Sequence, residues 1–223
     1  VLNITAPRRM AVLDPLKLVL VNMEPGQVEE VEVKNNPEDE SAGSRKVPLG
    51  RELWIERDDF MIEAPRKYFR LAPGRAVRLR GGYIVQYSGH LTDPESGEVT
   101  EVHCEYLPGT IGQSPPEGVV CKAAIHWVSA AEAEEAEVRL YDRLFDHENP
   151  DAAEGGYLSV LNPDSLDIVT SARLEPGLGN ESPGFVCQFE RLGYFCADSR
   201  YHQPGRRAVY NRTIGLRDSW AGK

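Results

Sequence analysis

RKYFRLAPGRAVRLR, residues 66–80, combines a turn signal with the start of an alternating segment. The Ala-Pro-Gly sequence at residues 72–74 favours a turn. In residues 77–80, the apolar side chains of Val and Leu alternate with those of Arg. Because successive side chains of a β-strand face opposite sides, this period of two predicts a strand with one buried face and one cationic face.

The same alternation recurs along the chain and predicts an all-β fold. Alternating segments occupy residues 31–33, 83–85, 138–141 and 185–190, and Pro-Gly turns lie at 25–26, 73–74, 108–109 and 176–177. Many short strands with regular turns are typical of β-barrels and sandwiches. We expect two tandem antiparallel β-barrels with few short helices, the helices lying near residues 58–63, 131–136 and 164–166.

A turn-rich segment near the middle of the chain, LPGTIGQSPPEG at residues 107–118, has the composition of a linker. It separates two halves of similar size. We therefore expect a first barrel with an N-terminal lead-in segment over residues 1–112 and a second barrel over residues 113–223.

The composition is that of a globular protein, with 41% apolar and 27% charged residues among 223. No run of about 18 apolar residues occurs, so we expect no membrane-spanning helix. The first residues, VLNITAPRRM, hold neither an initiator Met nor an apolar signal-peptide core. We expect the chain to begin within a longer, cytoplasmic protein. Its four cysteines form no C-x-x-C pair, so we expect reduced thiols and no metal site.

Charge is distributed unevenly along this chain, whose formal net charge is −10. Residues 117–181 hold 14 acids against 4 bases. In contrast, residues 64–92 hold 6 bases and no acid, and residues 183–217 hold 6 Arg against 2 acids. Because the local field decides where a polyanion docks, an acidic protein with two basic segments can still bind one.

The first basic segment has features of an RNA-binding surface. Residues two apart on a strand are about 6.5–7 Å apart, so Arg78 and Arg80 would project from one face at about the spacing of phosphates in an extended strand. Tyr68 and Phe69 offer rings on which unstacked bases can stack. The alternative is a solvated basic face that protects a strand edge from aggregation.

The second basic segment contains CQFERLGYF at residues 187–195. The amide of Gln188 can donate and accept at once, as reading a base edge requires. Arg191 lies three residues further on, so both side chains reach one ligand only if the strand ends or bulges near Leu192 and Gly193. The alternative is that Gln188 and Glu190 face water and Arg191 pairs with a carboxylate.

Five long segments in this chain closely resemble the C-terminal, anticodon-binding half of the bacterial glutaminyl-tRNA synthetases. The likeness runs from Asn3 to Trp220. The segments are RRMAVLDPLKLVLVN (8–22), AIHWVSA (124–130), EVRLYDRLF (137–145), CQFERLGYFCADS (187–199) and YNRTIGLRDSW (210–220). The resemblance implies two β-barrels related to ribosomal protein L25 and a site for the anticodon loop of glutamine tRNA.

The resemblance also implies roles for individual residues at the central anticodon base. Asn3 and Arg8 match positions at the start of the anticodon-binding body. Arg8 and Gln188 match the residues that read the central uridine, and Arg191 matches a residue that supports their pocket.

For the other two anticodon bases, the resemblance implies that Arg70 reads the third base, a guanine, whose O6 and N7 acceptors suit a forked guanidinium. Arg78 would contact the first base, with Arg80 nearby on the backbone. Phe69 stands where several relatives carry Lys, so stacking would replace a phosphate contact there.

The sequence lacks the motifs that a catalytic half of such a synthetase needs. It has no HIGH-like or KMSKS-like motif, no G-x-G-x-x-G and no P-loop. We therefore expect no catalytic residue and no cofactor in this chain, with ATP and Mg²⁺ bound by the missing half of the parent ligase. The expected partner is glutamine tRNA, with no DNA and no membrane, and the expected state is a monomer.

Three alternatives remain open. An archaeal or eukaryotic-type glutamyl-tRNA synthetase shares the two-barrel half but reads an anticodon ending in cytosine, so that Arg70 is the discriminating position. A stand-alone L25-like protein would bind helical ribosomal RNA. An independent enzyme would need acid–base groups such as His126, Asp142 or His147, but none lies in a nucleophile motif, and His126 is expected in the core.

Overall fold

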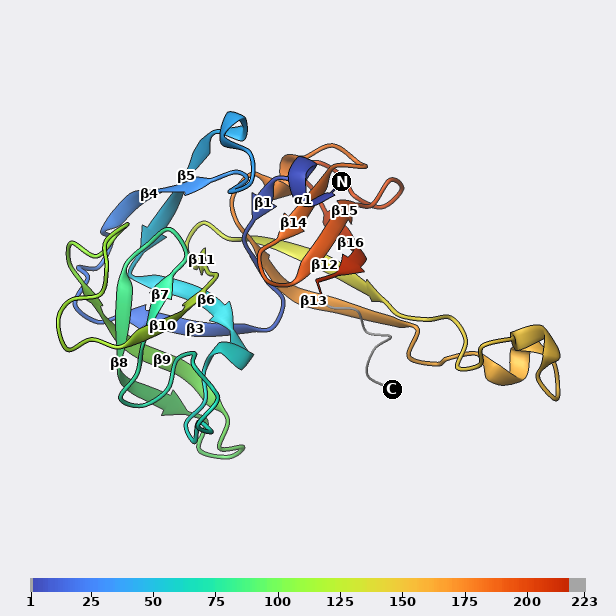
Figure 1. Ribbon diagram of the computed structural model, residues 1–223, viewed down its shortest axis with the longest axis horizontal. Helices are drawn as coiled ribbons and strands as arrows, with labels where there is room; N and C mark the ends of the chain where they lie inside the picture. Colours follow the sequence, from blue (N-terminus) through green and yellow to red (C-terminus); the bar gives the residue numbers. More distant parts are fainter. Residues whose placement is uncertain (1, 217–223) are drawn as a thin grey trace.

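The computed structural model describes residues 2–216, which form two seven-stranded sheets and a two-stranded ribbon. Each large sheet curls into a barrel-like body, and the two bodies lie side by side (Figure 1). The last of the five segments that resemble the synthetases, residues 210–220, extends beyond this range, so its residues 217–220 lie outside the described residues. No helix within residues 2–216 is long and apolar enough to cross a membrane.

The first sheet has the strand order β10-β7-β8-β9-β3-β6-β11. Its core contains the buried side chains of Leu18, Leu79, Val85 and Trp127, all 0% exposed. Its strands are β3 (Pro15–Leu20), β6 (Glu52–Glu56), β7 (Ala76–Leu79), β8 (Ile84–Thr92), β9 (Val99–Leu107), β10 (Cys121–Ile125) and β11 (Val128–Ser129).

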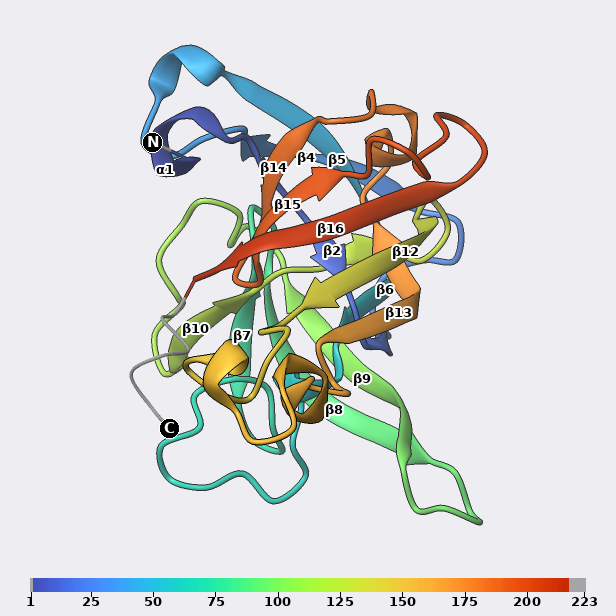
Figure 2. The ribbon, with the colours of Figure 1, turned by 90° about the vertical axis from the view of Figure 1, so that its right-hand side faces the viewer.

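The second sheet has the strand order β1-β14-β15-β16-β12-β13-β2. Its core is aromatic, because the ring centroid of Phe189 lies 4.2 Å from that of Phe195 and 5.3 Å from that of Tyr210. Figure 2 shows the long strand β16 running beside β15 and β12. The strands are β1 (Arg8–Arg9), β2 (Ala11–Val12), β12 (Glu134–Tyr141), β13 (Leu166–Leu174), β14 (Val186–Phe189), β15 (Gly193–Ala197) and β16 (Ala208–Gly215).

The remaining elements are short. Strands β4 (Val28–Lys34) and β5 (Ser44–Gly50) form the ribbon, and α1 (Leu2–Thr5) lies beside the second sheet (Figure 1). The connection from β12 to β13 projects from the body as an arm (Figure 1). Within residues 2–216, the 3-10 helices are Glu40–Ala42, Arg57–Asp59, Pro150–Ala152, Tyr157–Val160 and Leu178–Asn180.

The all-β, two-barrel prediction with few helices is confirmed, with two differences. The helices expected at residues 131–136 and 164–166 are wrong. Strand β12 begins at Glu134 and pairs with both β13 and β16, and residues 163–165 form a turn from which β13 begins at Leu166. The sheets are also mixed rather than antiparallel throughout. The pairs β1–β14, β3–β9, β7–β10 and β12–β16 run parallel, and in each of them the long connection between the strands makes room for the crossover that a parallel pair needs.

Strand pairing does not follow a division of the chain at residues 112 and 113. Residues 108–120 form neither helix nor strand, as expected of a linker. After them, however, β10 and β11 return to the first sheet and pair with β7 and β6. At the other end of the chain, β1 and β2 join the second sheet. Each sheet therefore takes strands from both sides of the expected boundary.

Candidate nucleic-acid interface

The turn that joins β14 to β15, residues 190–192, is a strained element that meets both sheets. Arg191 has φ of 68°, and within residues 2–216 it is the only non-glycine residue with positive φ. Such a conformation costs a β-substituted residue about 1–2 kcal/mol. A Cβ on Gly193, whose φ is 151°, would lie 2.7 Å from the carbonyl oxygen of Ile214. Strand β14 ends at Phe189. The end of this strand is the condition that the sequence set for Gln188 and Arg191 to reach one ligand, and the structure meets that condition.

Arg8 and Gln188 meet at the parallel pairing of β1 with β14, where they stand in register. The Nη1 of Arg8 donates a hydrogen bond to Oε1 of Gln188, and its Nη2 donates to Oδ1 of Asn3 over 2.8 Å. Arg8 is 5% exposed and Gln188 is 7% exposed. The structure therefore brings Arg8 and Gln188, the two residues predicted to read the central base, together with Asn3, which was predicted at the start of the anticodon-binding body, and it holds the guanidinium in one orientation.

Arg191 and Arg70 share one buried carboxylate, although Arg191 lies in a turn of the second sheet and Arg70 in a loop between two strands of the first. Asp59, which is 0% exposed, accepts hydrogen bonds of 2.6 and 2.7 Å from the two Nη atoms of Arg191 and one of 3.1 Å from Nη1 of Arg70. Burial lowers the pKa of Arg191, but its hydrogen bonds with Asp59 and the charge of Asp59 outweigh that effect and raise the pKa above its ordinary value. Both side chains keep about a third of their surface exposed, 32% for Arg191 and 34% for Arg70.

A second layer of polar residues lies behind this pair. Nδ1 of His126 is 3.4 Å from Nη1 of Arg191, and its Nε2 is 3.3 Å from Oε1 of Glu56. Glu56 in turn accepts a hydrogen bond of 2.8 Å from the backbone N–H of Leu13. His126 is 1% exposed, so its predicted place in the core is confirmed.

Arg80 reaches the same turn, whereas Arg78 does not. Val77 and Leu79 are 0% exposed, which confirms the alternation predicted for this strand. Nη2 of Arg80 lies 2.7 Å from Oε2 of the buried Glu190. Arg78 instead donates to the backbone carbonyl oxygen of Thr110, over 2.6 Å, and so holds the linker.

The two neighbouring rings differ in accessibility. Tyr68 is 7% exposed, its hydroxyl donates to the carbonyl oxygen of Asp58 over 2.9 Å, and Cζ of Arg70 lies 4.9 Å from its ring centroid. Burial raises the pKa of Tyr68 to about 12. Base stacking on Tyr68 stays a prediction, and it requires this ring to become more exposed when RNA binds. Phe69 is 50% exposed and is open to a base.

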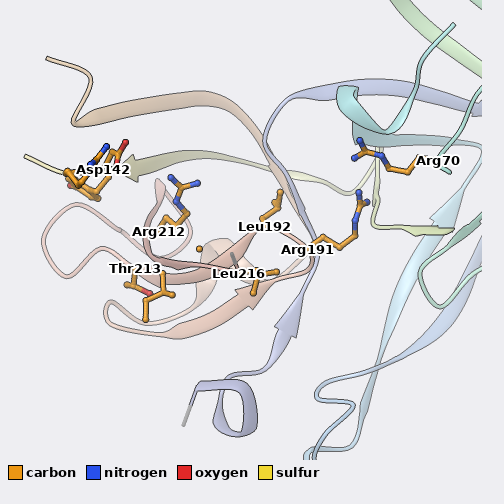
Figure 3. Close-up of a pocket in the computed structure, with 11 residues that line it drawn as sticks. Arg70, Asp142, Arg191, Leu192, Arg212, Thr213 and Leu216 are labelled. Atoms are coloured by element: carbon orange, nitrogen blue, oxygen red, sulfur yellow. Dashed lines mark hydrogen bonds and ion pairs between the residues drawn. The ribbon is translucent and has the colours of Figure 1, made fainter. Parts of the chain in front are cut away.

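A cleft of about 840 Å³ opens beside the turn (Figure 3). Of the residues that the structure describes, four arginines line it together with one carboxylate, that of Asp142. Arg70 comes from the loop between β6 and β7, and the other lining residues come from the end of β12 and the residues after it, from the turn, and from β16 and the residue after it. The arginines are Arg70, Arg143, Arg191 and Arg212. Within residues 2–216, no three His, Cys, Asp or Glu side chains are arranged to hold a metal ion.

Comparison with known protein families identifies the family of this chain. Two family models, both described as the anticodon-binding domain of class I tRNA synthetases (E and Q), match residues 6–107 and 124–198. The chain belongs to this synthetase family. It comprises the anticodon-binding domains, which confirms the resemblance seen in the sequence.

Individual relatives of these anticodon-binding domains are glutamine–tRNA ligases. The ligase of Pseudomonas syringae pv. tomato is 49% identical over 221 residues, which are 98% of this chain and 38% of that ligase. The ligases of Cupriavidus metallidurans and Bordetella avium are 52% and 53% identical over 98% and 96% of this chain, and over 37% and 36% of their own length. The chain thus spans less than two fifths of these relatives, and their names do not favour the glutamate alternative.

The sequence did not predict that Asp59 and Glu190 are the carboxylates that pair with the arginines of this site. The alternative that Arg191 pairs with a carboxylate is confirmed, but the sequence did not identify Asp59, which lies 132 positions away. The alternative that Gln188 and Glu190 face water is wrong, because they are 7% and 6% exposed. For Glu190, the cationic face of residues 77–80 was a usable signal, since an opposing basic strand demands a counterion. For Asp59, no local signal exists.

Proposed function

We propose that this chain binds the anticodon loop of a glutamine tRNA. One observation carries the proposal: side chains from both sheets converge on residues 188–191. Arg8 contacts Gln188, Arg80 contacts Glu190, and Arg70 shares Asp59 with Arg191. A loop whose bases are splayed apart can be contacted at several points by such a group.

The chemistry of these side chains suits base recognition more than uniform phosphate binding. The amide of Gln188 can donate to and accept from the Watson–Crick edge of a uridine. A guanidinium matches the O6 and N7 acceptors of guanine, and Asp59 fixes the fork of Arg70 on one side while a third of that side chain stays accessible. Because the carboxylate restricts rotamers before binding, less conformational entropy is lost when RNA arrives.

We propose further that the chain serves a parent glutamine–tRNA ligase whose remaining part binds ATP and Mg²⁺ and attaches glutamine. On its own the chain would bind RNA as a monomer without catalysis, in the cytoplasm, and would bind neither DNA nor membranes. The family match and the names of the relatives support the link to the ligase. The absence of HIGH-like and KMSKS-like motifs from the sequence supports the lack of catalysis.

The test is filter binding of the chain to glutamine tRNA transcripts in which each anticodon base is changed in turn. Wild-type protein should lose affinity for each change. Arg70→Ala should weaken binding by about 1–3 kcal/mol and relax the preference at the third base alone. Arg66→Ala is the matched control, because Arg66 is an exposed arginine of the same segment. Equal affinity of the wild type for all anticodons would contradict the proposal.

A further inference from the structure

The side chain of Arg212 makes no hydrogen bond or ion pair with residues 2–216, although it lines the cleft beside the turn. The other two cleft arginines near the turn, Arg70 and Arg191, are both paired with Asp59. Figure 3 shows the Arg212 side chain rising from β16 between Asp142 on one side and Leu192 and Arg191 on the other. A half-buried guanidinium without a counterion attracts an anion from outside the protein.

A β-bulge in β16 places this side chain. Tyr194 stands opposite Ile214 but Phe195 stands opposite Arg212, so that Thr213 is an extra residue in β16. The hydroxyl of Thr213 donates to the carbonyl oxygen of Tyr194 over 3.1 Å and fixes the bulge. Bulges redirect side chains and are frequent beside functional sites. Arg212 is therefore held in the cleft by backbone structure, as Arg191 is.

The groups around Arg212 favour a phosphate over a base edge. Arg143 and Asp142 stand at the rim of the cleft, 41% and 53% exposed, with Nε of Arg143 3.9 Å from Oδ1 of Asp142. The wall beside Arg212 is formed by apolar Leu192 and Ile214. Among residues 2–216, the cleft is thus lined by four arginines and one exposed carboxylate, and beside Arg212 these residues supply no amide with which to read a base.

We propose that Arg212, with Arg143 at the rim, binds a backbone phosphate of the RNA strand whose bases lie at Arg70 and Arg191. This inference rests on the proposed function, and neither arginine was among the residues implied by the family resemblance. The contact is independent of base sequence. It positions the strand in the cleft, and the residues around the turn then discriminate the bases.

The test uses the 223-residue chain and glutamine tRNA transcripts with each anticodon base changed, measured by filter binding from 50 to 200 mM KCl. Losing one phosphate contact to a single strand should lower the salt slope by about 0.7 and the affinity at 0.1 M salt roughly 5-fold. Arg212→Gln should show both effects equally for every anticodon. Arg212→Lys, which keeps the charge, should retain the slope.

Arg206→Gln is the matched control. Arg206 is an exposed arginine between β15 and β16, it lines a different concavity, and its removal changes net charge by the same amount. If Arg212→Gln matched Arg206→Gln in affinity and slope, the inference would be overturned. A loss confined to one anticodon base would also overturn it, because Arg212 would then read a base. Failure of the proposed function looks different: the wild type itself would not distinguish anticodons.

Discussion

Replacing Asp59 with Asn should loosen two arginines at once. The buried carboxylate accepts three hydrogen bonds, of 2.6, 2.7 and 3.1 Å, from the guanidinium groups of Arg191 and Arg70. Asn preserves the shape of Asp59 but turns one oxygen into an NH₂ group. That group can only donate, and so can a guanidinium, so at least one of the three contacts becomes donor against donor.

The size of the effect follows from burial. Removing one partner of a fully buried ion pair costs about 3–5 kcal/mol, whereas exposed pairs contribute about 0–1 kcal/mol. Asp59 is 0% exposed, but its partners are 32% and 34% exposed, so water can replace part of what they lose. We therefore expect the Asp59→Asn variant to be less stable by about 2–3 kcal/mol. For a chain of this size, that lowers the Tm by about 5–10 °C.

Two assays on the same protein separate stability from recognition. Urea denaturation followed by circular dichroism gives the free energy of unfolding, and filter binding to transcripts altered at each anticodon base gives discrimination. Asp59→Asn should relax discrimination at the third and central bases together, since Arg70 and Arg191 share the carboxylate. Arg70→Ala should affect the third base only. Asp58→Asn is the matched control, because Asp58 is exposed and its side chain changes charge equally.

Two results would refute this reasoning. One is a free energy of unfolding for Asp59→Asn within about 0.5 kcal/mol of that for Asp58→Asn, the scatter typical of surface substitutions. The other is a variant that remains folded at the assay temperature yet discriminates at every position as the wild type does. In that case the carboxylate would not orient either guanidinium.

Other substitutions test the turn, the stability at low pH and the stacking ring. Gly193→Ala should cost about 2 kcal/mol or more, measured by urea denaturation, because its Cβ would lie 2.7 Å from the carbonyl oxygen of Ile214; an unchanged midpoint would show that the turn can relax. Burial raises the pKa of Asp198, but hydrogen bonds from the amide of Asn211 and from two backbone N–H groups outweigh this and lower the pKa below 3.8. The ionised carboxylate therefore stabilises the fold above that pH, and this contribution is lost as the pH falls through the lowered pKa. Asp198→Asn should therefore be less stable than wild type at pH 7 by about 1–2 kcal/mol, and the difference should shrink below pH 3.8; a constant difference across pH would contradict the assignment. Phe69→Ala should weaken RNA binding by about 1–3 kcal/mol without a change in Tm, whereas Tyr68→Phe should leave binding unchanged; the reverse order would show that the buried ring opens to a base.

The sequence predicted what depends on neighbouring residues. Alternation located β7 and β14 because the two faces of a strand meet different environments, and the glycine at 193 indicated where β14 must end. The helix predicted from the local sequence at residues 131–136 was wrong. Their Ala and Glu content favours a helix, but Glu134 to Tyr141 is paired on both sides by distant strands, and that pairing overrides local propensity.

In the candidate site, too, the sequence predicted features set by neighbouring residues and not those set by distant ones. Its cations were visible as a local excess of charge, but their partners were not. Asp59 contacts Arg191 across 132 positions, and no local pattern marks that pairing; Glu190 contacts Arg80 across 110, and there the cationic face of residues 77–80 indicated that a counterion was needed but not which residue supplies it. The parallel pairing of Arg8 with Gln188 is likewise set by the path of the chain between the two sheets.

The two buried acids separate charge from geometry as causes of recognition. Asp59 and Glu190 lower the positive charge of a face proposed to meet RNA, which would be a disadvantage if attraction to phosphates were its main task. Each, however, holds an arginine that is partly exposed: Arg70 at 34% and Arg80 at 45%. An unrestrained arginine loses about 2 kcal/mol of rotamer freedom when it is fixed, and a guanidinium fixed in advance loses less on binding. Asp59→Asn therefore sets the two causes in opposition, since it removes one negative charge while releasing two arginines. If geometry governs recognition, affinity for mismatched anticodons should hold or rise while preference for the cognate anticodon falls.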